Sequence, residues 1–443
     1  MNIQEQLMSL VEQSTAHGDS WIPNDIRSKA RAAFLQLGFP TVKHEEWKFT
    51  NIIPVLKGEM MIDNFTQQDY LDPLSINDLL SAHLEEIQAQ MKGEPKGAYR
   101  LVLMNNNIVE DLSYLPDTRQ LRVGYLSALT ESRKSRLKIG QIADIRNNHF
   151  TTLNTALVRD GLLIEVADRV VIDKPVHIVH ILDNNQSVFY NTRAFIHVGK
   201  NAQVEFVETY LNRSDLSQKV IVNAVYEFQL ESQAICDHYD IQKTKAHFHQ
   251  VKRTEVAQAL HSNYSNYTFN LPGGSFFRNN LSIYIEDKDT ECHLYGLYLT
   301  DKTQLVDNHT EVHHKFPNCE SNQLYKGVLL EESKAVFNGK IFVYEDAQKT
   351  NAFQKSNNIL LSDKATINAK PQLEIFADDV KCSHGSTIGQ LDEKALFYLK
   401  SRGIGEATAK KMMVNAFAFD VAEKVKNPTL RHYLEEQITI AIH

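Results

Sequence analysis

The chain has 443 residues, of which 42% are hydrophobic and 23% charged, and its formal net charge is -8. Single hydrophobic cores stop growing at roughly 250–300 residues, so two or three domains are expected. An acidic chain is poorly suited to neutralising phosphate groups. The composition therefore argues against nucleic acid and against an anionic membrane surface as partners.

The N-terminal stretch MNIQEQLMSLVEQSTAHGDSW lacks arginine and has no apolar core of signal-peptide length. It therefore predicts neither a secretory signal nor a transit peptide. No apolar run reaches the roughly 18 residues that would span a membrane. The four cysteines contain no C-x-x-C pair, which argues against a disulfide framework and against a local zinc site. We expect a cytoplasmic protein.

Residues 1–149 are predicted to form a mostly helical N-terminal domain. Within residues 24–38, apolar side chains recur at helical spacing, and Gly38 is positioned to end the helix. A further helix is expected over residues 75–92, and a short strand over residues 99–104.

From residue 150 the helical spacing gives way to short β-rich runs separated by polar turns. Three segments resemble one another: LYLTDKTQLVDN, VLLEESKAVFNG and ILLSDKATINA. Their residues after the turn are Gln304, Ala335 and Ala365, at spacings of 31 and 30. A weaker pair, Ala202 and Ala234, is 32 residues apart. The next expected copy, at Ser275, is 41 residues beyond Ala234, which predicts insertions in some repeats.

A period near 31 is typical of stacked units that cannot bury their apolar faces alone. We therefore predict a mainly β protein in which residues 150–385 form a right-handed parallel β-helix. A large β-sandwich is the alternative. Residues 386–443 are predicted to form a C-terminal helical domain. Its helices are expected after caps at Asp392, Gly405 and Asn427.

Several motifs raise chemical hypotheses with a structural alternative beside them. RGIGEATAKKMM, from Arg402, is similar to the turn of helix-hairpin-helix DNA-binding modules, although a plain helix–helix turn is favoured. Two histidine clusters are candidate metal ligands or ordinary hydrogen-bonded histidines: His247 with His249, and His309 with His313 and His314. No phosphate-binding loop or nucleophile elbow is found.

The most specific candidate is the pair Cys382 and His384, within ADDVKCSHGSTIG. On a strand, residues i and i+2 point the same way, about 6–7 Å apart. Thiolate and imidazole are ligands for iron, copper and zinc. Two ligands leave a four-coordinate site incomplete, so a second protein or a second copy of the chain would have to complete it. The alternative is that Cys382 is a small core residue and His384 caps a carbonyl.

Residues 370–404, KPQLEIFADDVKCSHGSTIGQLDEKALFYLKSRGI, closely resemble the C-terminal signature of the SufB/SufD family of the SUF iron–sulfur cluster assembly system. KHEEWKFTNI, from Lys43, resembles the family's N-terminal segment K-x-E-x-W-[RK]-[YF]-T. The resemblance implies a non-enzymatic scaffold with a β-helix core. It also implies two partners, a SufB-like paralogue and a SufC-like ATPase. Without them, a homodimer is possible.

The resemblance further implies that clusters form at the SufB–SufD interface, where Cys382 and His384 match the family's C-S-H-G motif. The C-terminal helices would dock the ATPase. The iron–sulfur cluster would be held transiently, and reduced flavin is a possible cofactor of the complex that we map to no residue. SufB-like chains carry E-H-E in place of C-S-H-G and an upstream C-D-S-L-L-I-G stretch. Here that stretch reads SNNILLS, with Ser356 at the cysteine position, which favours the SufD branch.

Two other functions compete with assembly. One is a β-helix carbohydrate-active enzyme, for which the sequence offers no legible carboxylate cluster. The other is DNA binding through the hairpin at residues 402–413, which the acidic charge disfavours.

Overall fold

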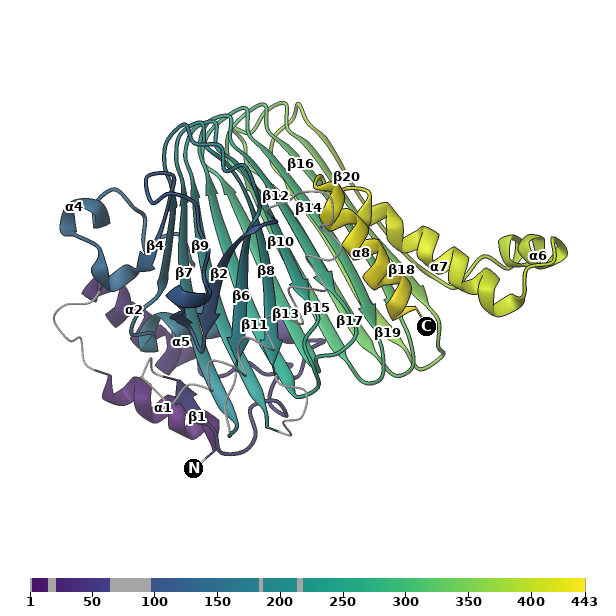
Figure 1. Cartoon of the computed structure of the whole chain (residues 1–443), viewed down its shortest axis with the longest axis horizontal. Helices are drawn as coiled ribbons and strands as arrows, with labels where there is room; N and C mark the ends of the chain where they lie inside the picture. Colours follow the sequence, from purple (N-terminus) through teal and green to yellow (C-terminus); the bar gives the residue numbers. More distant parts are fainter. Residues whose placement is uncertain (1, 15–20, 64–96, 183–185, 213–217, 443) are drawn as a thin grey trace.

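The structure is a computed structural model that describes residues 2–14, 21–63, 97–182, 186–212 and 218–442. Its body consists of two long sheets, and from β5 to β20 successive strands alternate between them (Figure 1). The strands of sheet A are β5 (Leu162–Val166), β7 (Val188–Val198), β9 (Val220–Leu230), β11 (Phe248–Gln258), β13 (Phe276–Ile285), β15 (Leu305–His314), β17 (Lys334–Val343) and β19 (Thr366–Ile375). The strands of sheet B are β6 (Val176–Leu182), β8 (Gln203–Asn212), β10 (Ile235–Gln242), β12 (Asn263–Asn270), β14 (Glu291–Thr300), β16 (Glu320–Leu329), β18 (Asn351–Leu360) and β20 (Lys381–Gly389).

Neighbouring strands in each of these runs pair in parallel, which confirms the predicted solenoid and excludes the sandwich. Alternate side chains of every strand point into the space between the sheets, which we call the lumen. One such row, in register across sheet A, contains Val222, Phe277, Val306 and Ala335, all buried. The main core is therefore a set of side-chain rows that run along the solenoid axis.

The corner before each sheet B strand from β8 to β18 has the same local conformation. A residue with positive φ is followed by a small, buried residue, as at Asn201 before Ala202 and Gln233 before Ala234. Asparagine tolerates this left-handed conformation better than most residues, and a small residue fits inside a tight corner. The corresponding residues before β12, β14, β16 and β18 are His261, Asp289, Asn318 and Lys349.

The corners correct part of the repeat alignment. The predicted match of Ala202 with Ala234 is confirmed, but the counterpart of Ala234 in the next coil is Ser262, which is 28 residues on, since Ile235 pairs with Asn263. Ser275 belongs to the other corner, before sheet A, so the 41-residue spacing does not indicate an insertion there. At that second corner, the counterpart of Gln304 is Ser333 and not Ala335, which is two residues further on.

The N-terminal region covers the outer face of sheet A. Helices α1 (Ile3–Gln13), α2 (Asn24–Leu37) and α5 (His149–Leu157) pack on that face through a common apolar cluster. The predicted helix at 24–38 is confirmed as α2, and Gly38 follows it with φ of 62°. The helix expected over residues 75–92 lies outside the described residues.

Strands from this region also extend the sheets. The strand expected at 99–104 is confirmed as β2 (Tyr99–Met104), which pairs in parallel with β6. The other short elements are β1 (Met61–Asp63), β3 (Asn107–Ile108), β4 (Leu121–Tyr125), α4 (Glu131–Lys134) and the 3-10 helices η1 (Glu45–Trp47), η2 (Glu110–Leu112) and η3 (Leu126–Ala128). The division into domains at residues 149 and 385 stays a prediction.

The C-terminal helices form where the caps predicted them. They are α6 (Glu393–Ser401), α7 (Glu406–Ala422) and α8 (Pro428–Ala441). The Asp392 carboxylate accepts a hydrogen bond from the Lys394 N–H at 2.8 Å, which caps α6. The apolar face of α8 packs with α7 on the outer face of sheet B, so its partner is this chain. By contrast, α6 buries no residue and projects from the body (Figure 1). Within the described ranges, no helix is long and apolar enough to cross a bilayer.

Candidate functional site

The solenoid ends at β19 and β20, which we call the open end. Each of these strands pairs on one side only among the described residues. Along β20 every side chain is exposed except that of Cys382, which is half-buried. Exposed apolar residues also gather in the last coils: Phe353, Ile375, Phe376 and Ile388. An unpaired strand edge beside exposed apolar side chains is typical of a surface that pairs with another protein.

Cys382 and His384 both lie on β20, which continues unbroken to Gly389. They pair in register with Ala352 and Gln354 of β18, whose side chains are buried in the lumen. In-register residues on parallel strands share a face, so both candidate ligands point toward the lumen side of the open end. The prediction that a strand would place them on one face is therefore confirmed. Their role as ligands is not tested by this geometry.

The two side chains differ in their surroundings. Cys382 packs against the apolar cluster of the last coils, and burial raises the pKa of its thiol although a backbone hydrogen bond at Ala352 opposes this. Binding a metal would therefore require the thiol to lose its proton. His384 is exposed, and its ring makes no hydrogen bond to the residues that the structure describes. The carbonyl-capping alternative for His384 therefore has no such contact to support it.

The structure gives less support to the two other histidine clusters as metal sites. His247 has φ of 65° and lies at a corner before β11, so it does not share a strand face with His249. Burial lowers the pKa of His249 to about 3, so the ring is neutral. On β15, His309 and His313 point to the outer face of sheet A, and His314 points into the lumen; His309 and His314 are both buried. Among the described residues, no group of three or more His, Cys, Asp or Glu side chains is arranged to hold a metal.

The N-terminal motif KHEEWKFT folds over the outer face of sheet A. Glu46 accepts hydrogen bonds from Lys340 Nζ at 2.6 Å and from His309 Nδ1 at 3.2 Å. Burial alone would raise the pKa of Glu46, but the bonds from His309 and Lys340 outweigh it and lower that pKa. Trp47 lies under the guanidinium of Arg278, whose central carbon is 3.9 Å from the ring centroid. This segment therefore clamps three successive strands, β13, β15 and β17.

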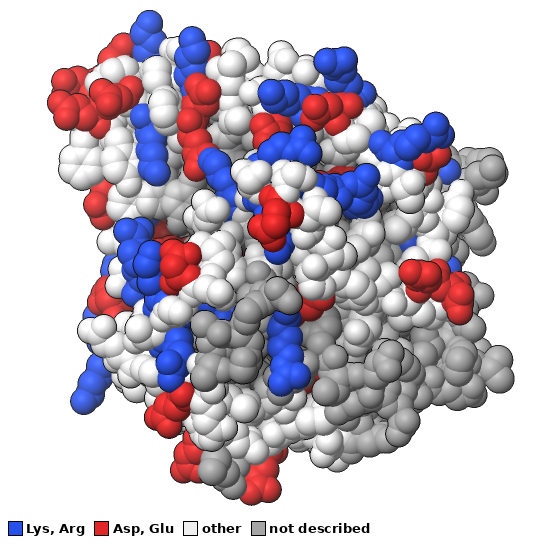
Figure 2. Space-filling model, turned by 90° about the vertical axis from the view of Figure 1, so that its left-hand side faces the viewer, with Lys and Arg blue, Asp and Glu red and all other residues white. Residues whose placement is uncertain are grey.

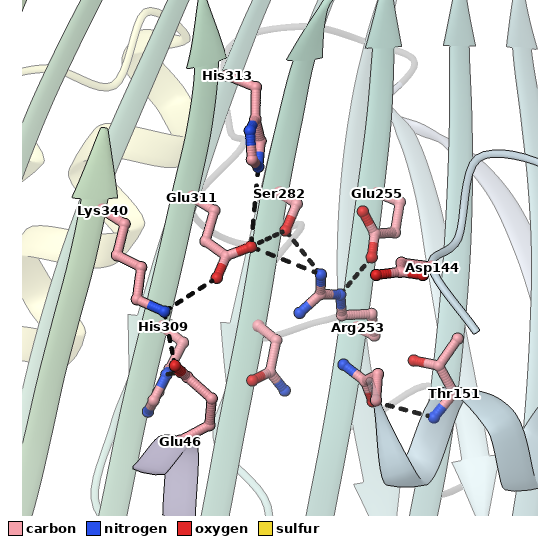
Figure 3. Close-up of polar contacts among 12 residues, drawn as sticks. Glu46, Asp144, Thr151, Arg253, Glu255, Ser282, His309, Glu311, His313 and Lys340 are labelled. Carbon is pink, nitrogen blue, oxygen red and sulfur yellow. Dashed lines mark hydrogen bonds and ion pairs between the residues drawn. The ribbon is translucent and has the colours of Figure 1, made fainter. Parts of the chain in front are cut away.

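Between this clamp and sheet A is a polar cavity of about 450 Å³. Its charged side chains are largely paired with one another (Figure 3). Lys340 Nζ lies 3.5 Å from Glu311, and Arg253 donates to Ser282 Oγ at 2.9 Å and to Glu255. Opposite charges that already neutralise each other favour a structural role for this network over the binding of a charged ligand.

The pKa values of two acids in this network shift in opposite directions. It raises the pKa of Glu255 to about 7, although the charge of Arg253 opposes it. Burial would also raise the pKa of Glu311, but the hydrogen bond from His313 and the charges of Arg253 and Lys340 hold it at about 2. The two carboxyl groups therefore titrate in different pH ranges although both contact Arg253.

Inside the lumen lies a charged cluster that the sequence spacing does not predict. Lys252 Nζ is 2.7 Å from Glu208 Oε2 and 2.7 Å from Asp240 Oδ2, and all three side chains are buried. Burial opposes ionisation of Glu208, but the charge of Lys252 and hydrogen bonds from His180 and His238 hold its pKa well below the usual range. The only sequence signal for this cluster is that Lys252, Glu208 and Asp240 occupy inward-facing positions of β-rich runs.

The turn between α6 and α7 occupies the position of the suspected DNA-binding hairpin. Gly403 has φ of 84° in this turn, and Gly405 is the N-cap of α7, as in an ordinary helix–helix connection. The face shown in Figure 2 lies at the opposite end of the molecule from this hairpin, and Lys and Arg side chains there are interspersed with Asp and Glu. Mixed charge of this kind differs from the basic stripe of nucleic-acid-binding proteins.

Comparison with known proteins shows that the chain matches a protein family. Residues 180–417 match the family model described as SUF system FeS cluster assembly, SufBD core domain, and residues 1–178 match the SufBD protein N-terminal region. The two models together cover the solenoid, the N-terminal clamp, α6 and most of α7.

Three relatives are similar over most of their length. An iron–sulfur cluster assembly SufBD family protein of Synechocystis is 29% identical, over 99% of this chain and 95% of the relative. The iron–sulfur cluster assembly protein SufD of Escherichia coli is 27% identical, over 91% of this chain and 89% of its own. Protein ABCI7, chloroplastic, of Arabidopsis thaliana is 26% identical, over 96% of this chain and 87% of its own.

These matches favour cluster assembly over the carbohydrate-active and DNA-binding alternatives, because the core family model and the Synechocystis and Escherichia coli relatives are all named for iron–sulfur cluster assembly. With a β-solenoid between helical regions, and with its two motifs on the clamp and at the open end, this chain belongs to the SufBD family of iron–sulfur cluster assembly proteins.

Proposed function

We propose that this chain is a non-enzymatic scaffold subunit of a SUF complex and that iron–sulfur clusters form at its open end, against a SufB-like paralogue. The observation that carries the proposal is the position of Cys382 and His384 on one face of the last strand of sheet B. An incomplete ligand pair is useful where a second protein supplies the remaining ligands. The cluster is cargo, held until it is passed on.

Cys382 would bind iron as a thiolate and His384 through an unprotonated ring nitrogen. The raised pKa of the Cys382 thiol means that iron must compete with its proton, which favours binding at higher pH. In a SufB-containing complex, acidic and histidine side chains of the paralogue would complete the site. In a homodimer, two pairs would meet across a two-fold axis.

The second surface is the hairpin of α6 and α7, which would dock a SufC-like ATPase. The side chain of Phe397 is 73% exposed, Met412 is exposed, and α6 buries nothing within this chain. Phe417 lies beneath this surface, with Lys326 Nζ 4.3 Å from its ring centroid. Exposed large apolar residues on a projecting hairpin support docking. Reduced flavin is proposed only for the whole complex, and we assign no residue to it.

The test is anaerobic cluster reconstitution on the complex purified with its paralogue and ATPase. His384→Ala is expected to leave complex formation intact and to abolish or sharply reduce cluster yield, measured by absorbance and by iron and sulfide content. Cys382→Ser is expected to act similarly if the thiolate binds iron. Ser383→Ala is the matched control, because Ser383 lies between the two on the opposite face of β20. Full cluster yield with His384→Ala would overturn the ligand role.

A further inference from the structure

A ladder of amide side chains runs through the lumen toward the open end. Gln323 of β16 and Gln354 of β18 are neighbours in register, and both are buried. Gln354 Nε2 donates to Gln323 Oε1 at 2.6 Å, and Gln323 Nε2 donates to Thr310 Oγ1. Gln354 thus donates away from the open end to the Gln323 carbonyl oxygen, and Gln323 in turn donates across the lumen to Thr310 on β15.

The last oxygen of this ladder has no partner. Gln354 Oε1 is buried and makes no hydrogen bond to the residues that the structure describes. Leaving a buried acceptor unpaired costs about 1–3 kcal/mol, so a partner is expected. The residue at the same position of the next strand is His384, about 4.8 Å away along the sheet at the backbone.

The fold makes specific room for the Gln354 amide. Gly339, on β17 across the lumen, faces it so closely that a Cβ at Gly339 would lie 2.0 Å from Gln354 Nε2. Any other residue at position 339 would displace the amide. The close approach of Gly339 therefore fixes the orientation of the Gln354 amide. In this orientation the nitrogen donates to Gln323, and the oxygen is available to a residue of the next coil.

We infer that Gln354 is a positioning residue for His384. The structure does not contain a bond between the two, and we infer that the His384 ring turns to donate one N–H to Gln354 Oε1, which leaves the other ring nitrogen free for iron. This rests on the proposed function of His384. Metal-binding histidines almost always donate their second ring N–H to an acceptor, which fixes the tautomer and the orientation of the ring. Gln354 supplies that acceptor from inside the solenoid, whereas the ligands beyond Cys382 and His384 would come from the partner protein.

The test reads the tautomer of His384 directly. The chain is labelled with ¹⁵N-histidine, and two-bond nitrogen–proton couplings are recorded at pH 8, with the His384 signals identified by their loss in His384→Ala. A single tautomer is expected in the native chain and in Gln354→Glu, which keeps an acceptor oxygen. Both tautomers are expected in Gln354→Met, which matches the length of glutamine without its amide. Ser356→Ala, on the same strand and face, is the control and should keep one tautomer.

The second readout is cluster formation on the complex. In Gln354→Met, the Fe(II) concentration for half-maximal cluster yield should rise between about 10- and 100-fold. Gly339→Ala gives the same two readouts should Gln354→Met not fold. If Gln354→Met changes neither the tautomer nor the iron dependence while His384→Ala abolishes the cluster, the positioning role alone is wrong. If His384→Ala leaves the cluster intact, the ligand role of His384 is wrong, whatever the tautomer.

Discussion

Lys340 Nζ lies 2.6 Å from Glu46 Oε1, although the two residues are 294 positions apart in the chain. This contact joins the N-terminal motif to the seventeenth strand and, through Glu311, to the polar network on sheet A. It explains why a short charged segment near the start of the chain accompanies a C-terminal signature. The N-terminal segment fastens the coils that lie just before the open end.

Removing this clamp should loosen the last coils. Glu46→Gln is expected to destabilise the chain by about 1–3 kcal/mol, because His309 and Lys340 lose a charged acceptor in a partly buried site. Urea unfolding measures the change. Glu45→Gln is the matched control, since Glu45 pairs with Lys370 at the surface and should cost no more than about 1 kcal/mol. Equal losses in the two variants would contradict the clamp.

The charged cluster in the lumen should be sensitive to loss of one member. Lys252→Met leaves Glu208 and Asp240 buried without their cation, and about 3–5 kcal/mol of stability should be lost in urea unfolding. Lys364→Met breaks a surface pair with Glu332 and should cost about 0–1 kcal/mol. A Lys252→Met chain as stable as the Lys364→Met chain would show that this cluster does not support the fold.

Glu255 should make the stability of the folded chain fall as the pH rises. Its pKa, raised to about 7, means that the folded chain holds a proton that the unfolded chain releases near pH 4.5. The stability that this proton contributes, about 3 kcal/mol, is fully present below about pH 4.5 and is lost as the pH rises through 7. Urea unfolding from pH 4.5 to 7.5 should show a shallower fall for Glu255→Gln than for the native chain. Parallel profiles would contradict the raised pKa.

A substitution on the exposed face of the α6–α7 hairpin should weaken ATPase binding without affecting folding. Phe397→Ser is expected to change stability by no more than about 0.5 kcal/mol, because the side chain is mostly exposed. Association with the ATPase, measured by calorimetry, should weaken about tenfold or more. Ile440→Ser removes an exposed apolar side chain from α8 and should leave association unchanged. Unaltered ATPase affinity in Phe397→Ser would rule out this docking surface.

The sequence predicted most of the local structure but not the contacts between residues that are far apart in the chain. The caps at Asp392 and Asn427 fixed the starts of α6 and α8, because capping is decided within a few residues. The repeat was predicted but misaligned at Ser275, because each coil has two corners with similar turn residues, and spacing alone does not separate them. The contact of Glu46 with Lys340 depends on the folded solenoid, so no local pattern carried it.

The candidate site was predicted in the same partial way. Placing Cys382 and His384 on one face needed only the period of a strand. The Gln354 ladder could not be predicted, because it depends on which residues of successive coils come into register, and the coil lengths vary between 28 and 32 residues at the corner marked by Ala202, Ala234 and Ser262.

The central claim is that the open end of this chain supplies iron ligands to a cluster shared with its paralogue. Pulsed electron paramagnetic resonance tests it most directly, on the reduced cluster of a complex in which only this chain carries ¹⁵N-histidine. A strong ¹⁵N hyperfine coupling is expected, and it should vanish in His384→Ala while the paralogue's own ligands remain. A cluster that forms normally and shows no ¹⁵N coupling, or a coupling that persists in His384→Ala, would contradict the account.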